Sequence, residues 1–302
     1  MARLDTLAAA LTAAGIDYSC GELLAGHCTF RIGGAADVFV RPRDESELCK
    51  AIKLCMDSET KYFLLGNGSN ILFSDEGFHG AVIDVSAMSS ELLLDGNVIT
   101  ASAGCTLMQL CRFAQKNQLA GLEFAYGIPG TVGGAVYMNA GAYGGEMKDV
   151  VRDVTLLQKD GHIAKLSGSE MQFRYRHSIL EDSGACVLHV CFALAPGDEK
   201  MISARMEELM ARRREKQPLD KPSAGSTFKR PEGAFAAALI EQCGLRGYRV
   251  GGAAISEKHC GFVVNLGGAS CADVLCLCRD VTEAVKGKTG YALEKEVRVV
   301  GD

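Results

Sequence analysis

A glycine-rich run in the middle of the chain is the feature that most constrains how this sequence can fold. It reads Gly127-Ile128-Pro129-Gly130-Thr131-Val132-Gly133-Gly134-Ala135-Val136. Glycine admits positive φ and a close approach of backbone to a ligand, Pro129 fixes the turn, and the apolar residues from Val132 onward favour a helix start. The first amide hydrogens of such a helix are expected to point at an anion. The run predicts a diphosphate-binding turn, and a tight turn between two core elements is the alternative.

A second glycine-rich turn, Gly66-Asn67-Gly68-Ser69-Asn70, follows the strand-like residues 62–65. It offers backbone amides and polar side chains to the same kind of ligand. Its two glycines imitate the dinucleotide-binding fingerprint, but Ile71 stands where that motif has a third glycine, and residues 73–77 are expected to continue as loop. A Rossmann unit is therefore disfavoured. A third stretch, residues 29–34, also carries two glycines, and the three turns together predict one extended, phosphate-bearing ligand.

Composition indicates a globular chain and excludes several classes of function. The 302 residues, 48% of them hydrophobic, predict two or three domains. A formal charge of −5 argues against a nucleic-acid partner, because such proteins usually present a basic face. The basic run at residues 212–216 ends a predicted helix, where cations complement the helix dipole, so a solvated terminus is favoured over anion binding. The N-terminus lacks a signal-peptide core and no stretch reaches ~18 apolar residues, so a cytoplasmic protein without membrane contact is expected.

The thirteen cysteines are scattered and odd in number. Several occupy apolar positions of predicted helices, namely Cys49, Cys55, Cys111, Cys276 and Cys278. The chain has no Cys-x-x-Cys pair, and its six histidines are dispersed. We therefore predict reduced core thiols and no metal site.

Hydrophobic periodicity predicts an α+β chain. Helices are expected over residues 4–14, 45–56, 107–116, 202–216, 234–243 and 272–286, and strands over 37–40, 62–65, 81–84, 98–103, 151–157, 185–194, around 253, 262–265 and 291–300. We expect three parts: an N-terminal α/β part of the ligand-binding region at 1–65, its second subdomain at 66–197 and a substrate-binding domain at 198–302. A cleft between the last part and the glycine-rich region is the expected substrate site.

Three polar residues outside the periodic helices are candidates for chemistry. Arg176 lies in residues 173–178, where strand alternation would put it and Tyr175 on opposite faces; its planar guanidinium suits a carboxylate. Ser226 follows a glycine and is either a hydroxyl proton donor or a turn residue, since no Gly-x-Ser-x-Gly elbow supports a hydrolase. Glu296 lies on one face of a predicted strand. The alternatives for Arg176 and Glu296 are an ordinary surface arginine and a solvated strand edge.

Taken in order, these motifs resemble the UDP-N-acetylenolpyruvoylglucosamine reductase family. The matching segments span nearly the whole chain: Phe30-Arg31-Ile32-Gly33-Gly34, Leu65-Gly66-Asn67-Gly68-Ser69-Asn70, Gly127-Ile128-Pro129-Gly130-Thr131-Val132-Gly133-Gly134, Tyr175-Arg176, Gly225-Ser226-Thr227-Phe228 and Glu294-Lys295-Glu296-Val297-Arg298. The glycine turns are shared with other flavoproteins of the same FAD-binding fold. Arg176, Ser226 and Glu296 in that order are specific to the reductase.

The resemblance implies a fold, an activity and a cofactor. The fold is α+β, with an FAD-binding region of two α+β subdomains (PCMH-type) and a C-terminal α+β substrate-binding domain. The activity is the NADPH-dependent, FAD-mediated reduction of UDP-N-acetylglucosamine enolpyruvate to UDP-N-acetylmuramate in bacterial peptidoglycan precursor synthesis. FAD is expected to bind noncovalently and NADPH to act as reducing co-substrate. No nucleic acid, membrane or obligate protein partner is expected.

The resemblance also implies residue roles. Arg176 would hold the substrate carboxylate, Glu296 would polarise it, and Ser226 would give its proton to the alpha carbon. The FAD-binding residues implied are Arg31, Gly66, Asn67, Gly68, Ser69, Asn70, Gly127, Ile128, Pro129, Gly130, Thr131, Gly133 and Gly134. The substrate-binding residues implied are Tyr175, Lys216, Arg230 and His259.

Two segments depart from the usual family pattern. Cys260-Gly261 stands where the family pattern has Ala-Asn, and the stretch from Ser178 to Leu194 is too short for the tyrosine-bearing loop that caps substrate in one branch. The chain therefore resembles the loopless branch. Two other functions remain open from the sequence: an FAD oxidase or dehydrogenase of a small alcohol or sugar, and a non-catalytic nucleotide-sugar sensor.

Overall fold

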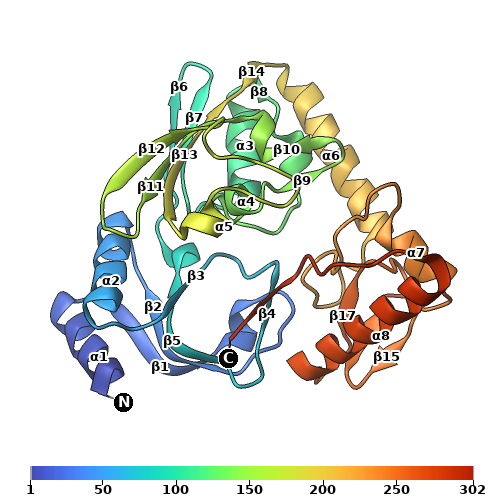
Figure 1. The fold of residues 1–302 in the computed structure, drawn as a ribbon. Coiled ribbons are helices and arrows are strands. Elements are labelled where there is room, and N and C mark those ends of the chain that lie inside the picture. The colour runs from blue at the N-terminus through green and yellow to red at the C-terminus, as the bar shows by residue number, and fades with distance from the viewer. Residues whose placement is uncertain (1, 302) are drawn as a thin grey trace. The chain divides into compact units, whose positions relative to one another are not determined.

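A computed structural model describes residues 2–301, which form two compact units (Figure 1). Unit 1 comprises residues 1–19, 38–67 and 80–213. Unit 2 comprises residues 20–37, 68–79 and 214–302. Both units are built from separate stretches of chain, because strands β1 (Asp17–Leu23), β2 (Ala35–Arg41) and β5 (Phe78–Asp84) carry the chain from one unit to the other. The three-part division expected from the sequence stays a prediction.

Unit 1 contains most of the helices and its own five-stranded sheet. Its helices are α1 (Ala2–Ala14), α2 (Glu45–Asp57), α3 (Leu107–Lys116), α4 (Val132–Tyr137), α5 (Leu180–Ser183) and most of α6 (Glu199–Lys216). Its strands are β3 (Tyr62–Leu65), β6 (Leu92–Asp95), β7 (Val98–Ser102), β8 (Leu119–Ala120), β9 (Gly141–Ala142), β10 (Gly145–Glu146), β11 (Val151–Leu157), β12 (Ile163–Ser167), β13 (Cys186–Ala193) and β14 (Ala195–Pro196). The five-stranded sheet has the antiparallel order β12-β11-β13-β7-β6.

The larger core of unit 1 lies between this sheet and helices α3, α4 and α6. It includes Ile99 and Phe192 from the sheet, Leu110 from α3, Val136 from α4 and Met206 from α6, all of them buried. Burying large apolar side chains contributes about 1.5–3 kcal/mol each, so this cluster stabilises both the sheet and the helices on it. Helix α4 is therefore fixed by its apolar face, and the glycine-rich run that leads into it is held in place.

A second core of unit 1 joins α1 and α2 to parallel strands. β3 pairs with β5 in parallel register, Tyr62 opposite Ala81 and Leu65 opposite Asp84. Leu11 of α1 and Leu48 of α2 are fully buried in this cluster. Because β3 ends at Leu65, the sheet delivers the chain directly into the turn at residues 66–70.

Unit 2 is assembled from the last third of the chain and two earlier segments. It contains α7 (Ala236–Gln242), α8 (Cys271–Thr289), the antiparallel sheet of β15 (Arg249–Val250), β16 (Ala253–Ile255) and β17 (Val263–Asn265), and the parallel pair of β4 (Ile71–Phe73) and β18 (Arg298–Val300). Helix α8 starts at a capping box formed by Ser270 and Asp273. The Asp75 carboxylate accepts hydrogen bonds from the backbone amides of Cys271 and Ala272, at 2.7 and 2.9 Å, and so ties the segment after β4 to the start of α8.

The α+β class predicted from the sequence is confirmed, and so are all six predicted helices, with ends that differ by one to three residues at most. Nine strands went unpredicted, most of them of only two to four residues: β1, β4, β6, β8, β9, β10, β12, β14 and β15. The prediction of loop over residues 73–77 is confirmed for 74–77 and wrong for Phe73, which belongs to β4. The predicted strand at 291–300 is regular only from Arg298 onward.

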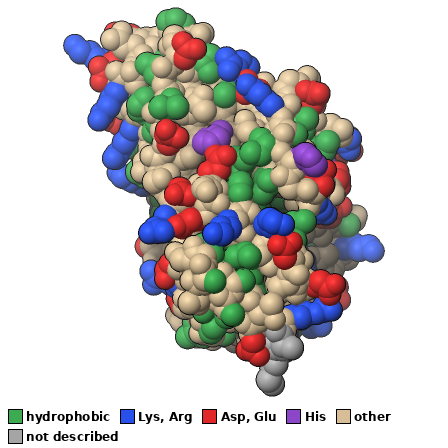
Figure 2. All heavy atoms as spheres, turned by 90° about the vertical axis from the view of Figure 1, so that its left-hand side faces the viewer, with side chains coloured by type: hydrophobic (Ala, Val, Ile, Leu, Met, Phe, Trp, Pro, Cys, Tyr) green, Lys and Arg blue, Asp and Glu red, His purple; other side chains and the backbone are tan. Residues whose placement is uncertain are grey.

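Charges of both signs are interspersed on the face drawn in Figure 2. Blue and red side chains alternate there with apolar and uncharged ones, which is the usual pattern of a mixed-charge surface. Among residues 2–301, no helix is both long and apolar enough to cross a bilayer.

The cysteines are free thiols, as predicted. Nine of them, including Cys55 and Cys186, are buried, whereas Cys20 is exposed. Burial raises the pKa of the Cys55 and Cys186 thiols to about 12. Since the thiolate is the nucleophile, these two thiols stay protonated and unreactive at neutral pH.

Alkylation of the native protein at pH 7 should therefore modify Cys20 well before Cys55 or Cys186. Peptide mass spectrometry after a short treatment with iodoacetamide measures the order, and the same treatment in denaturant should label every cysteine. Early labelling of Cys186 in the native protein would contradict the burial of this thiol.

Candidate active site

The two long glycine-rich turns meet inside unit 1. Asn67 donates from Nδ2 to the carbonyl of Pro129 at 2.9 Å. A Cβ atom built on Gly66 would lie only 2.5 Å from Oγ1 of Thr131, so glycine is needed where the turns touch. Thr131 is in turn bridged to Thr106, which precedes α3. The two turns are therefore in direct contact, and the single extended ligand expected from the sequence stays a prediction.

The glycine-rich run leads into α4 as predicted, but the first amides of that helix already have partners. The amide of Val132 donates to Cys105 O at 2.8 Å, that of Gly133 donates to Ala103 O at 2.9 Å, and that of Gly134 donates to Oγ1 of the N-cap Thr131 at 3.3 Å. The expectation that these amides point at an anion is therefore wrong. Gly133 packs against Ala103, the residue after β7. A Cβ added to Gly133 would lie 3.1 Å from Ala103 Cβ.

The turn at residues 66–70 supplies the donors that an anion needs. Within residues 2–301, the amides of Asn67, Gly68 and Ser69 donate to no acceptor. Consecutive amides without protein acceptors form a concave, positively polarised surface suited to phosphate oxygens. The donor set of this turn therefore fits the diphosphate of a dinucleotide such as FAD.

In unit 2, the third glycine-containing stretch, residues 29–34, lies beside Gly68 of the turn at residues 66–70. The amide of Thr29 donates to Gly68 O at 3.2 Å. Gly68 has a φ of 57°, and an added Cβ would lie 2.4 Å from His27 O, so only glycine is tolerated there. Arg31 is exposed, with a positive φ of 56°.

Arg176 lies at the tip of a tight hairpin of unit 1, which we call the arginine hairpin (Arg174–His177). The amide of Arg174 donates to His177 O at 3.0 Å and the amide of His177 donates back at 3.2 Å. Tyr175 and Arg176 are thus the two turn residues, and Arg176 has a φ of 56°. The predicted strand alternation over 173–178 is wrong at this point.

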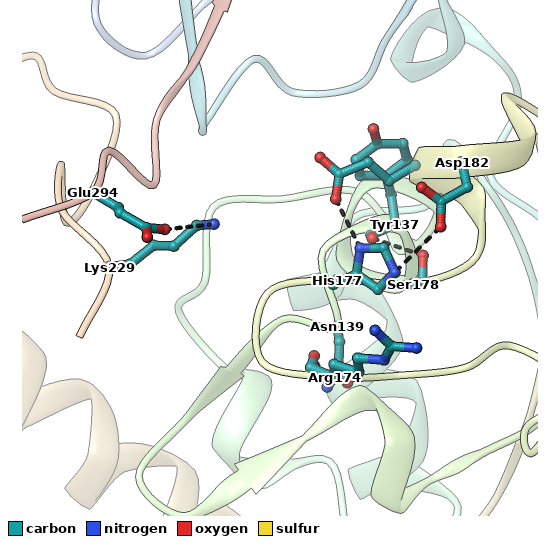
Figure 3. Close-up of polar contacts among 9 residues, drawn as sticks. Tyr137, Asn139, Arg174, His177, Ser178, Asp182, Lys229 and Glu294 are labelled. Atoms are coloured by element: carbon teal, nitrogen blue, oxygen red, sulfur yellow. Dashed lines mark hydrogen bonds and ion pairs between the residues drawn. The ribbon is translucent and has the colours of Figure 1, made fainter. Parts of the chain in front are cut away.

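The Arg176 guanidinium is held close to the backbone. Its Nη2 donates to Gly141 O at 3.3 Å, and its central carbon lies 4.9 Å from the centroid of the Tyr175 ring. His177 pairs with Glu181 at 2.9 Å and with Asp182 at 3.6 Å, and Figure 3 shows the Asp182 carboxylate directed at its ring. The hairpin is therefore fixed by contacts on both sides of Arg176.

Ser226 and Glu296 are brought together within unit 2. Ser226 forms a bridge to Phe262, and the amide of Glu296 donates to the carbonyl of the next residue, Thr227, at 2.8 Å. Both candidate side chains are half-buried. Two segments separated by about seventy residues thus run side by side, with the serine and the glutamate one position out of register.

The same two segments are joined again a few residues further on. The amide of Lys229 donates to Glu294 O at 2.8 Å, and the side chains of these residues form an ion pair at 3.5 Å, drawn in Figure 3. Asn70 donates from Nδ2 to the carbonyl of Glu296 at 3.1 Å. Asn70 belongs to the turn at residues 66–70, which we call the flavin turn because the resemblance assigns it to FAD. One residue of the flavin turn therefore contacts the backbone of Glu296.

The four predicted substrate-binding residues have different surroundings. Tyr175 is 49% exposed at the hairpin tip, and Lys216 is exposed at the last position of α6. The Arg230 guanidinium stacks 3.8 Å from the centroid of the Phe235 ring. His259 is half-buried.

His259 is held by its own loop. Its Nδ1 accepts from the amide of Gly261 at 3.1 Å, and its ring meets Phe262 edge-on at 5.0 Å between centroids. Burial lowers the pKa of His259, so the imidazole is neutral near pH 7. A neutral ring that accepts at Nδ1 carries its proton on Nε2 and offers a single hydrogen-bond donor rather than a full charge.

Sequence reasoning missed several residues that shape the site. Arg213 belongs to the basic run interpreted as a solvated helix end, yet only 8% of it is exposed, and burial lowers its pKa. It lies 3.5 Å from the position of a Cβ on Gly127, and its guanidinium is 5.8 Å from the centroid of the Tyr143 ring. Asn139 is fully buried with a φ of 42°. The sequence predicts a helix start at Val132 but no helix end, so the only signal for Asn139 was that asparagine commonly follows the end of a helix.

Metal ligation receives no support from the side chains described. Within residues 2–301, no three His, Cys, Asp or Glu side chains gather in a way that would hold a metal ion. The three residues predicted to carry the chemistry are Arg176 in unit 1 and Ser226 and Glu296 in unit 2.

Comparison with known proteins supplies the family. Residues 217–300 match the model for the C-terminal domain of UDP-N-acetylenolpyruvoylglucosamine reductase, and residues 36–167 match an FAD binding domain. A UDP-N-acetylenolpyruvoylglucosamine reductase of Clostridium novyi is 47% identical over 93% of this chain and 91% of its own length. That of Clostridioides difficile is 47% identical over 95% of this chain and 94% of its own length.

A solved structure agrees over nearly the full length. The crystal structure of the UDP-N-acetylenolpyruvylglucosamine reductase from Thermus caldophilus is 37% identical, with a TM-score of 0.79 over 94% of this chain and 98% of that one. The fold is accordingly the FAD-binding, PCMH-type fold with mixed helices and strands. The chain belongs to the UDP-N-acetylenolpyruvoylglucosamine reductase family.

Proposed function

We propose that this protein reduces UDP-N-acetylglucosamine enolpyruvate to UDP-N-acetylmuramate, with FAD as cofactor and NADPH as electron donor. Family membership over 93% of the chain supports the reaction. The observation that carries the proposal is the position of Ser226 and Glu296 on adjacent segments, one residue out of register, because these are two of the three residues expected to handle charge and proton at the reacting carbons. Its cytoplasmic location stays a prediction.

The glycine-rich turns are the proposed cofactor site. The amides of Asn67, Gly68 and Ser69 are suited to the diphosphate, and the loop at 127–134 borders them through the Asn67 contact with Pro129. FAD, when bound there, supplies hydride chemistry between NADPH and the substrate. Noncovalent binding is expected.

The chain's own residues deal with the charge that hydride addition creates. A hydride added to the methylene carbon of the enolpyruvyl ether leaves an electron pair on the alpha carbon, delocalised into the carboxylate. Arg176 is proposed to hold that carboxylate through its planar guanidinium, and Glu296 to polarise it by hydrogen bonding. The hydroxyl of Ser226 then transfers its proton to the alpha carbon, and the resulting alkoxide regains a proton from solvent. The net addition is one hydride and one proton across the double bond.

The remaining substrate contacts are proposed on charge. Lys216 and Arg230 flank Ser226 in sequence and suit the diphosphate of the nucleotide sugar. His259, as a neutral donor, suits a sugar or uracil oxygen better than a full negative charge. Tyr175 offers an exposed ring beside Arg176.

An absorbance spectrum followed by two additions tests the proposal. The purified protein should be yellow, NADPH added under anaerobic conditions should bleach the flavin band, and the enolpyruvyl nucleotide sugar should restore it with one product molecule per flavin. A colourless protein that cannot be reconstituted with FAD would instead support a nucleotide-sugar sensor. Rapid oxygen consumption with a small alcohol, and no response to the enolpyruvyl substrate, would support an oxidase on the same fold.

A further inference from the structure

Two buried side chains fasten the arginine hairpin to the chain that follows α4. Asn139 donates from Nδ2 to Arg174 O at 3.0 Å, and Ser178 donates from Oγ to Tyr137 O at 2.8 Å. Figure 3 places Asn139 and Arg174 beside each other, and Ser178 next to Tyr137. Both Asn139 and Ser178 are 0% exposed. The hairpin is thus attached at its first residue and immediately after its last.

The side-chain amide of Asn139 has both its donor and its acceptor atoms engaged in this arrangement. Besides the bond to Arg174, its Nδ2 donates to Glu146 Oε2 at 2.6 Å, and its Oδ1 accepts from the amide of Lys148 at 3.0 Å. Its left-handed φ of 42° is one that asparagine tolerates better than most residues. A buried amide with every group satisfied fixes the backbone around it in one arrangement.

These contacts connect the glycine-rich run at residues 127–136 to Arg176. Helix α4 begins after the N-cap Thr131, which touches the flavin turn at Gly66, and it ends at Tyr137. Tyr137 and Asn139 then hold the hairpin. Arg176 has a left-handed backbone, which costs about 1–3 kcal/mol and persists only when its surroundings impose it.

We propose that Asn139 and Ser178 are positioning residues that hold Arg176 in place to bind the substrate carboxylate. They touch the backbone of the hairpin and of the α4 terminus, not the arginine side chain itself. Their effect on the reaction passes through Arg176 alone. The inference rests on the proposed role of Arg176 in substrate reduction.

Ser178→Ala is the principal test, because it removes one hydroxyl and leaves the fold intact. A hydrogen bond of this kind is worth about 0.5–1.5 kcal/mol, so substrate should bind about 2- to 10-fold more weakly to the flavin-loaded protein. Asn139→Ala should weaken it further, and amide hydrogen exchange over 174–178 should quicken in both variants while flavin content stays normal. Ser58→Ala is the matched control, because its hydroxyl likewise donates to a carbonyl, Leu54 O at 2.7 Å, at the end of α2.

A double-mutant cycle with Arg176→Ala isolates the positioning role. In the Arg176→Ala background, Ser178→Ala should have no further effect on substrate binding or on the rate of substrate reduction. Effects that multiply in the double variant, or wild-type binding in Ser178→Ala itself, would overturn the positioning role even if Arg176→Ala alone is severely impaired. Wild-type behaviour of Arg176→Ala would overturn the proposed function of the arginine together with this inference. If Asn139→Ala does not fold, Ser178→Ala decides alone.

Discussion

Ser226→Ala is expected to slow reduction of the enolpyruvyl substrate by about 10²–10⁴-fold, the usual contribution of a general acid, while NADPH still bleaches the flavin at nearly the normal rate. The two half-reactions differ because only the second needs a proton at the alpha carbon. Ser226 is half-buried and follows Gly225, whose φ is 74°. Its backbone is fixed by the bridge to Phe262, so removal of the hydroxyl should leave the local fold unchanged.

Stopped-flow absorbance traces of the two half-reactions measure the effect. Ser226→Cys should retain more activity than Ser226→Ala, since a thiol also gives a proton. Ser223→Ala is the matched control: Ser223 is tied to Thr29 through its backbone, at 3.1 and 2.6 Å, and those bonds survive truncation. Equal slowing of both half-reactions, or of neither, would remove Ser226 from the mechanism and leave it a turn residue.

Gly66→Ala should purify with little flavin, although Gly66 has an ordinary φ and the substitution is small. The added Cβ would lie 2.5 Å from the buried Oγ1 of Thr131. To relieve this overlap, residue 66 or Thr131 would have to move, and either shift would separate the two glycine-rich turns. Overpacking of this kind costs about 1–3 kcal/mol, which corresponds to about 5- to 150-fold in a binding constant. The flavin-to-protein absorbance ratio and a titration of the apoprotein with FAD measure the loss.

Two further variants make this result specific. Gly26→Ala is the control, because nothing lies within 4 Å of the added Cβ there. The double variant Gly66→Ala/Thr131→Ala lacks the clashing oxygen, so its flavin content should be higher than that of Gly66→Ala alone. It should stay below the wild-type content, because Thr131→Ala also removes the N-cap of α4. Full flavin content in Gly66→Ala would show that the contact between the turns does not support the cofactor site.

Local signals in the sequence were enough for the regular elements. Helix α3 was predicted with its observed bounds, Leu107–Lys116, because it combines an amphipathic pattern with a capping box formed by Thr106 and Gln109. β3 and β11 were likewise predicted to the residue, since β3 is an unbroken apolar run and β11 is rich in the Val, Thr and Leu that favour strands. The sequence signals that determine these elements lie inside them or within a few residues of their ends.

The arginine hairpin and strand β4 could not be predicted in the same way. The turn residues Tyr175 and Arg176 carry none of the glycine or asparagine that marks a two-residue turn, and the hairpin is imposed instead by Asn139 and Ser178. β4 has three residues and pairs with β18 at the other end of the chain. A strand whose stability comes from so distant a partner leaves little local trace.

Arg213 illustrates the same limit for the site. Its neighbours Arg212 and Arg214 are exposed, as expected for a helix end. Helical spacing puts Arg213 on the same face as the buried Ile202, Met206 and Leu209, but a charged side chain at that position is ordinarily expected to reach solvent. Only packing beneath Gly127 makes it a buried cation. The identity of the candidate residues was predictable from motifs, whereas the side chains that support them depend on tertiary contacts.

The pairing of β4 with β18 sets the order in which the protein can mature during synthesis. The ribosome makes the flavin turn early, but Asn70 reaches a carbonyl 226 residues later, and Ile71 pairs with Arg298 almost at the end of the chain. Chains fold from the N-terminus as they emerge, so unit 1 has most of its sequence long before unit 2 has its last strand. A nascent or truncated chain that stops before Glu296 lacks both the carbonyl that Asn70 contacts and the partner of β4, so we expect the segment after Gly68 to be fixed only once residues 296–300 have been made.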